Sequence, residues 1–126
     1  DRNGAAIRVE GTNFTLRKSF LHDNQNGILT GTNANSSIVI ETSEFGRNGY
    51  GDGLTHNLYI GRVKSLMFRY NFSHDANIGH NLKSRARINT IAYNRFSHRL
   101  NQYEARMGRF ADGFHGLLSR ELEREG

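Results

Sequence analysis

The chain has 126 residues, 36% of them apolar, a net charge of +5, and neither cysteine nor proline. This length suits a single domain with a modest core, and the missing cysteine excludes disulfides, cysteine metal sites and a thiol nucleophile. No apolar run approaches the ~20 residues that a membrane-spanning helix needs, so we expect no membrane partner.

Short alternating apolar segments recur through residues 1–99, and a small polar residue follows the main segment of each repeat. These anchor residues are Ser19, Ser43, Asn71 and Asn94, at intervals of 24, 28 and 23 residues. Apolar residues stand three positions before each anchor, at Leu16, Ile40, Phe68 and Ile91. A second apolar segment precedes each of these, around Ile7, Ile28, Leu58 and Leu82. A period of this length is typical of solenoids, in which each repeat stacks on the previous one.

Glycine and asparagine, fourteen of each, gather between the apolar segments. Both residues tolerate the left-handed backbone that sharp corners require. Together with the alternation they predict an all-β solenoid of about four rungs, each with two or three short strands. An antiparallel sandwich also has periodic turns, but the even spacing of such short strands favours the solenoid.

Two early motifs carry a family resemblance. Ala-Ile-x-Val within residues 5–9, followed by Phe-x-Leu-x-x-Ser-x-Leu at 14–21, resembles the right-handed parallel β-helix of the pectate-lyase-like superfamily. The resemblance covers residues 5–98. It implies a right-handed parallel β-helix and a secreted or periplasmic location. Because such families carry many more rungs, we expect a fragment or an unusually small relative.

Residues 100–126 leave the repeat pattern. Their apolar residues recur at steps of three and four: Leu100, Tyr103, Met107, Phe110, Phe114, Leu118 and Leu122. This spacing predicts an amphipathic helical segment, interrupted near 112–113 by glycine. The chain therefore divides into β-helix rungs at 1–99 and a helical tail at 100–126. The tail caps the solenoid, presents its apolar face to a second copy, or is an out-of-family segment acquired by frameshift or fusion. Because either of the first two routes hides apolar surface, we expect a homo-oligomer.

Positive charge is concentrated in residues 62–99, which hold eight basic side chains against Asp75 alone, a balance of +7. Such a band suggests an anionic partner. Aligning residues 56–61 with 80–85 places His56 over His80 and Tyr59 over Lys83. Since alternate residues of a strand share a face, the predicted surface holds Tyr59, Lys83 and Arg85, and also Arg87 if the strand continues. His56 or His80 lies at its edge.

An acidic polysaccharide suits this surface, because arginine forks bind carboxylate or sulfate groups and an aromatic ring gives a platform. The run Lys83-Ser84, followed by Asn89 and Asn94-x-Phe96, resembles the lysine-bearing rung of alginate- and chondroitin-type lyases. The resemblance implies that Lys83 acts as the base of a β-elimination, while the neighbouring Arg85 lowers the lysine pKa. The family's assisting arginine on the next rung has no counterpart, so binding by a degenerate lyase is the favoured hypothesis.

Three alternatives stay open beside it. The chain is a catalytic polysaccharide lyase, a structural protein that assembles through its C-terminal helix, or a non-specific nucleic-acid binder. The last is the least favoured, because no helix suits the major groove. No cofactor or metal is expected, since Asp23, Asp52 and Asp75 are scattered and no His-x-x-x-His pair occurs.

Overall fold

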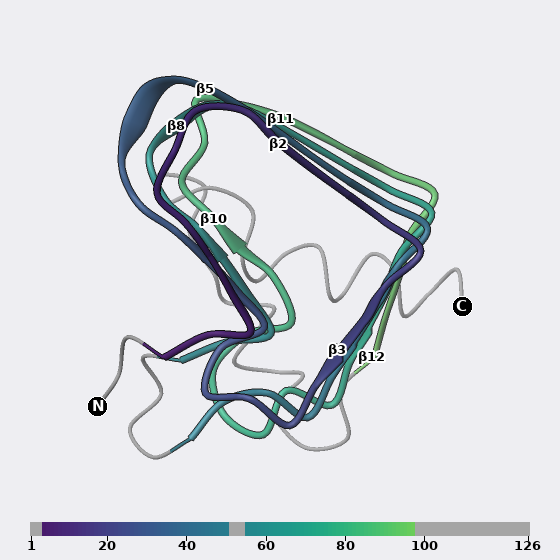
Figure 1. The fold of residues 1–126 in the computed structure, drawn as a ribbon. Coiled ribbons are helices and arrows are strands. Elements are labelled where there is room, and N and C mark those ends of the chain that lie inside the picture. Colours follow the sequence, from purple (N-terminus) through teal and green to yellow (C-terminus); the bar gives the residue numbers. More distant parts are fainter. Residues whose placement is uncertain (1–3, 51–54, 98–126) are drawn as a thin grey trace.

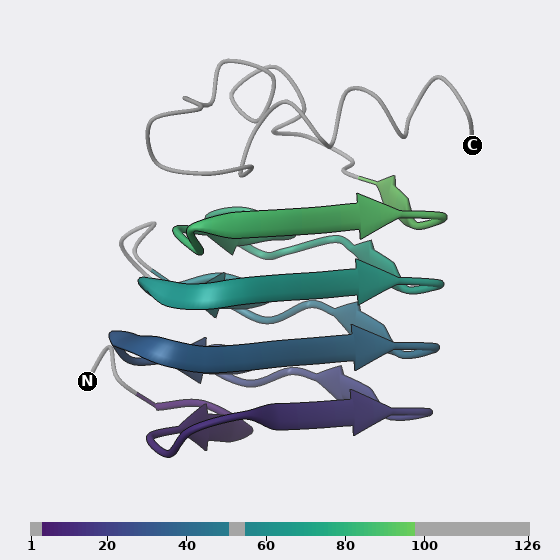
Figure 2. The same cartoon turned by 90° about the horizontal axis from the view of Figure 1, so that it is seen from above.

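The computed structural model describes residues 4–50 and 55–97, which form twelve short strands. The strands are β1 (Ile7–Val9), β2 (Phe14–Arg17), β3 (Phe20–His22), β4 (Ile28–Thr30), β5 (Asn33–Glu41), β6 (Glu44–Gly46), β7 (Leu58–Ile60), β8 (Val63–Arg69), β9 (Phe72–His74), β10 (Lys83–Ser84), β11 (Ile88–Ala92) and β12 (Arg95–Ser97). Figure 1 looks along the stack and Figure 2 shows its rungs lying one on another.

Three parallel sheets of four strands each surround the core. Sheet A contains β1, β4, β7 and β10, sheet B contains β2, β5, β8 and β11, and sheet C contains β3, β6, β9 and β12. Each rung gives one strand to each sheet in turn, so the described residues form an all-β parallel solenoid of about four turns, which confirms the predicted solenoid. The predicted helical tail lies outside the described residues.

The register of the sheets confirms the repeat alignment. Leu16 pairs with Ile40, Ile40 with Phe68, and Phe68 with Ile91. One interval reaches 28 residues because the connection between β6 and β7 is long. It spans residues 47–57, whereas the connection between β3 and β4 spans only residues 23–27. The corners absorb most of the difference in length, and within sheet B a β-bulge between Asn33 and Ser37 restores the register of β5 against β8.

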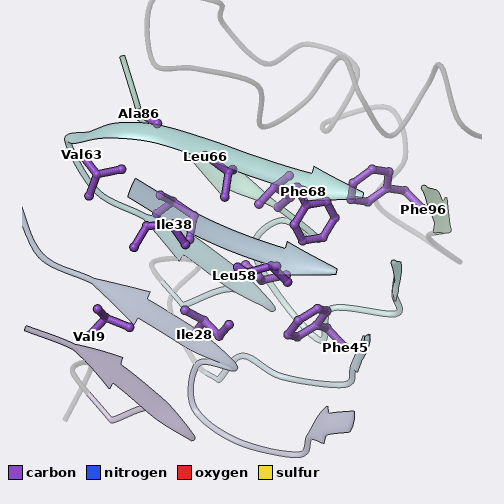
Figure 3. Packing of buried hydrophobic residues seen from close by; sticks show 13 residues of the cluster. Val9, Ile28, Ile38, Phe45, Leu58, Val63, Leu66, Phe68, Ala86 and Phe96 are labelled. Carbon is purple, nitrogen blue, oxygen red and sulfur yellow. The ribbon is translucent and has the colours of Figure 1, made fainter. Parts of the chain in front are cut away.

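The core is filled by the inward-facing side chains of all three sheets (Figure 3). Phe45, Phe68 and Phe96 form a continuous aromatic column, with ring centroids 6.2 and 5.8 Å apart. Phe45 and Phe96 come from sheet C, whereas Phe68 comes from sheet B. The third rung carries the small Ser73 at the sheet C position, so Phe68 supplies there the volume that Phe45 and Phe96 supply in their own rungs.

The anchor residues form a polar ladder at the corner between sheets B and C. The Ser43 hydroxyl accepts from the Ser19 N–H at 3.2 Å, Asn71 Oδ1 accepts from the Ser43 N–H at 2.9 Å, and Asn94 Oδ1 accepts from the Asn71 N–H at 2.9 Å. Asn71 Nδ2 also donates to the Ile40 carbonyl at 2.9 Å. Each side chain thus satisfies a backbone group of the previous rung, which the sharp corner removes from the strand ladders.

Ion pairs follow the same stacking on the outside. Glu41 lies between Arg17 and Arg69, at 2.8 and 2.9 Å, and the hydrogen bonds from Arg17 and then Arg69 hold the pKa of Glu41 below its ordinary value. Arg47 binds both carboxylate oxygens of Asp23, at 3.0 and 3.2 Å. That contact, with a smaller one from His22, lowers the pKa of Asp23 from 3.8 to about 2.

Replacing Asn71 by alanine tests the polar ladder. The change leaves a buried N–H and a buried carbonyl without their partner, and we expect it to lower the free energy of unfolding by about 1–3 kcal/mol. Urea unfolding followed by circular dichroism measures this, with Asn35→Ala as a control. Asn35 is exposed, so its replacement should stay within about 0.5 kcal/mol. Equal stability of the two variants would contradict the role of the ladder.

Acid titration tests the Asp23–Arg47 pair. Because the folded-state pKa of Asp23 is depressed, the stability that this carboxylate provides is complete above pH 3.8 and is lost as the pH falls toward about 2. The difference in urea midpoint between the wild type and Asp23→Asn should therefore shrink across this interval. A difference that stays constant down to the lower limit would show that the pair adds no stability.

Candidate functional site

Sheet A carries the predicted basic and aromatic surface. Tyr59 and Lys83 pair across β7 and β10, and the Lys83 ammonium lies 5.5 Å from the centroid of the Tyr59 ring. Leu58 and Leu82, their neighbours in sequence, are buried in the core. The register thus places the two polar residues side by side on the outward face, as the 24-residue alignment predicts. Their functional role stays a prediction.

His56 and His80 stack behind this face. The His80 N–H donates to Nδ1 of His56 at 2.9 Å, and the two rings lie 5.3 Å apart. Accepting this bond requires the Nδ1 of His56 to be unprotonated. His56 also packs edge-on against Tyr59 at 5.6 Å and is only 2% exposed. It therefore supports Tyr59 from inside, whereas the half-buried His80 is nearer the surface.

Arg85 and Arg87 lie at the corner between sheets A and B. β10 ends at Ser84, so the continued strand that would have aligned Arg87 with Lys83 does not form. The Arg85 N–H donates to the Ile60 carbonyl at 2.8 Å, and the Arg87 N–H donates to that of Val63 at 3.0 Å. Arg87 is exposed and Arg85 half-buried. The backbone of both arginines is therefore bonded to the preceding rung at this corner.

A second surface feature, which we name the corner groove, follows the corner between sheets B and C. Each rung contributes the same three consecutive positions to it: residues 18–20, 42–44, 70–72 and 93–95. Its volume is about 730 Å³, within the range of ligand sites in proteins. The anchor ladder forms its floor, and its two walls are the residues before and after each anchor.

The first wall consists of residues with left-handed backbone. Lys18, Thr42, Tyr70 and Tyr93 have φ angles of 51°, 54°, 59° and 59°. The tight corner requires this conformation, which turns their side chains outward. Tyr70 and Tyr93 stack with ring centroids 5.4 Å apart and planes inclined by 10°. They are 56% and 77% exposed, and the Arg69 guanidinium lies 5.9 Å from the centroid of the Tyr70 ring.

The second wall combines aromatic and charged side chains from sheet C: Phe20, Glu44, Phe72 and Arg95. The Arg95 guanidinium lies 5.1 Å from the centroid of the Phe72 ring, whose other neighbour is the stacked ring of His74 at 4.2 Å. The nitrogens of His74 lie 2.7 Å from Glu44 and 2.9 Å from Asp75. With Lys18 of the first wall, the groove thus presents aromatic rings, the cations of Lys18 and Arg95, and the carboxylate of Glu44.

Sequence reasoning missed the corner groove. The available signal is the position before each anchor, where the pairs Tyr70-Asn71 and Tyr93-Asn94 repeat an exposed aromatic residue beside a buried asparagine. The anchors predict which residues point inward, but sequence alone does not reveal that the adjoining backbone is left-handed. The outward direction of the tyrosines follows from that backbone.

Within residues 4–50 and 55–97, no cluster of three or more histidine or acidic side chains is placed to hold a metal ion. The same part of the chain contains no helix suited in length and apolarity to crossing a bilayer. Comparison with known protein families, curated proteins and solved structures finds no match. The pectate-lyase-like relationship therefore remains a resemblance.

Gly46 tests how firmly His74 is held beside the groove. A Cβ at residue 46 would lie 2.7 and 2.9 Å from two ring atoms of His74. Since the ring is fixed by Glu44 and Asp75, we expect Gly46→Ala to lower the free energy of unfolding by about 1–3 kcal/mol.

Gly11→Ala is the matched control, because a Cβ at residue 11 meets no atom within 4 Å. We expect this control to be neutral or more stable by about 0.4–1 kcal/mol. Thermal and urea unfolding measure both variants. If Gly46→Ala is as stable as Gly11→Ala, the histidine moves aside easily and does not fix Glu44.

Proposed function

We propose that this chain is a right-handed parallel β-helix domain of the pectate-lyase-like type that binds an acidic polysaccharide through the outward face of β7 and β10. The observation that carries the proposal is the Lys83 ammonium held 5.5 Å from the Tyr59 ring. A cation beside an aromatic platform offers both interactions that a charged sugar needs.

The exposed Arg87 extends this surface at the corner beyond β10. A polysaccharide of uronate or sulfated sugars carries its anionic groups at regular intervals, so one chain engages Lys83 and Arg87 in succession. Tyr59 pairs with Lys83 from the preceding rung, so its ring receives the C–H face of a sugar next to the one that Lys83 binds. His56 keeps this ring in place, because it packs edge-on against Tyr59 from the interior.

The proposal is for binding, without a chemical step. Elimination from a uronate requires a base at the C5 proton and neutralisation of the carboxylate. The resemblance to lyases gives the role of base to Lys83, with the half-buried Arg85 as its neighbour, whereas the proposal needs Lys83 only as a cation. The absorbance of an unsaturated product, followed in the binding mixtures, separates the two.

Lys83→Ala tests this face, with polygalacturonate as the probe. Loss of a charged contact costs about 1.5–3 kcal/mol, so we expect binding to weaken by about tenfold or more. Lys64→Ala is the matched control, because it removes the same charge from an exposed position on β8 in sheet B. Isothermal titration calorimetry of the full chain measures both variants, and the wild-type affinity should fall with rising salt.

Equal weakening by Lys64→Ala would show that net charge alone drives binding, which would contradict a defined face. Stronger binding to arbitrary duplex DNA than to polygalacturonate would replace the proposal by nucleic-acid binding. Release of an unsaturated product that Lys83→Ala abolishes would instead identify a lyase.

A further inference from the structure

The corner groove is separate from the sheet A face. In Figure 1, β10 lies on one side of the cross-section, and the corner that joins β2 and β11 to β3 and β12 lies on the other. The groove also shares no lining residue with the Tyr59–Lys83 pair. A ligand of the groove is therefore independent of the polysaccharide face proposed above.

The shape of the groove suits an extended chain. All four rungs line it, so it runs along the solenoid axis. Three intervals of ~4.8 Å between rungs give a length of ~14 Å. The same three positions recur in every rung, which repeats similar contacts at equal steps. A polymer with a short repeat matches such a surface better than a single compact molecule does.

The aromatic side chains indicate which kind of polymer the groove binds. The corner does not need tyrosine, because Lys18 and Thr42 occupy the same position with the same backbone in the first two rungs. Bulky side chains are also unfavourable in left-handed backbone. Tyr70 and Tyr93 stack on each other across the last two rungs, yet more than half of each side chain stays exposed. This remaining surface is available to a ligand, as is that of Phe20, which is 47% exposed.

The charges of the groove favour a neutral ligand. Lys18 lies in the first rung, Arg95 in the fourth, and Glu44 in the second. A polyanion along the axis would pass Glu44, whose Oε2 lies 2.7 Å from His74 but whose side chain is still 41% exposed. Hydroxyl groups both donate to a carboxylate and accept from a guanidinium or ammonium. A chain of uncharged sugars satisfies all three side chains and has C–H faces for the rings.

We propose that the corner groove is a second saccharide site, which binds a neutral oligosaccharide along the solenoid axis by contact with Tyr70 and Tyr93 and by hydrogen bonds to Glu44 and Arg95. Bound at opposite sides, a neutral and an acidic glycan would be held together by one domain. Loss of binding at one of the two sites is expected to leave binding at the other unchanged.

Tyr70→Asn and Tyr93→Asn test the groove in the full chain. Asparagine accepts left-handed backbone, so these variants remove the rings while the corner keeps its conformation. Tyr50→Asn is the matched control, since Tyr50 is 55% exposed but lies outside the groove. Isothermal titration calorimetry with cellohexaose, xylohexaose and mannohexaose measures binding, and circular dichroism checks the fold of each variant.

We expect at least one of these hexasaccharides to bind the wild type with an affinity that changes little between about 50 and 200 mM salt, because no ligand charge is involved. Each groove variant should weaken binding by about tenfold or more, whereas Tyr50→Asn and Lys83→Ala should bind as the wild type does. Binding of polygalacturonate by Tyr93→Asn should be unchanged.

Three results would overturn the proposal. The first is that none of the three hexasaccharides binds the wild type. The second is that the folded groove variants bind them as tightly as the wild type does. In the third, Tyr93→Asn loses polygalacturonate binding, which would make the groove part of an anionic site. If Lys83→Ala loses only the binding of polygalacturonate, the result concerns the sheet A face and leaves the groove proposal intact.

Discussion

The structure depends on satisfying the backbone at its corners. A solenoid turns sharply three times in each rung, and every turn takes N–H and carbonyl groups out of the sheets. Ser43, Asn71 and Asn94 replace the missing partners at one corner by reaching back to the rung before. At the opposite end of sheet C, buried Asn57 donates to Asn81 in the next rung at 3.0 Å. Without these buried side chains, the apolar strands would have no continuous path around the core.

This stacking fixes the surface as firmly as it fixes the core. Once the corners are in register, equivalent residues of successive rungs lie about 4.8 Å apart, so any side chain repeated in sequence becomes a column in space. Glu41 meets Arg17 and Arg69 in one such column, and Tyr70 meets Tyr93 in another. Surface chemistry is thus assembled from residues that are more than twenty positions apart, without any loop devoted to it.

Several parts of this arrangement could be predicted because they depend on periodicity alone. The intervals between anchors gave the pairing of Leu16 with Ile40, and the alignment of residues 56–61 with 80–85 gave that of Tyr59 with Lys83. The direction of Arg87 could not be predicted, because it depended on whether β10 continued beyond Ser84. Sequence also does not show that Phe68 fills the core volume left by the small Ser73. These two residues belong to different sheets of one rung, and only the packing brings them together. The repeat pattern shows which residues stack on one another within a sheet, but it does not show how the side chains of different sheets fill the core together.

The sequence by itself determined a parallel solenoid of about four rungs, its inward-facing residues, and the side-by-side placement of Tyr59 and Lys83. These follow from a period of 23–28 residues and from strand alternation, which act along the chain. Only the tertiary structure decided that His56 lies inside, behind Tyr59, and that the residues before the anchors turn outward to line a groove. The physical reason is that burial and a left-handed corner depend on what the neighbouring rungs leave space for, and no single repeat contains that information.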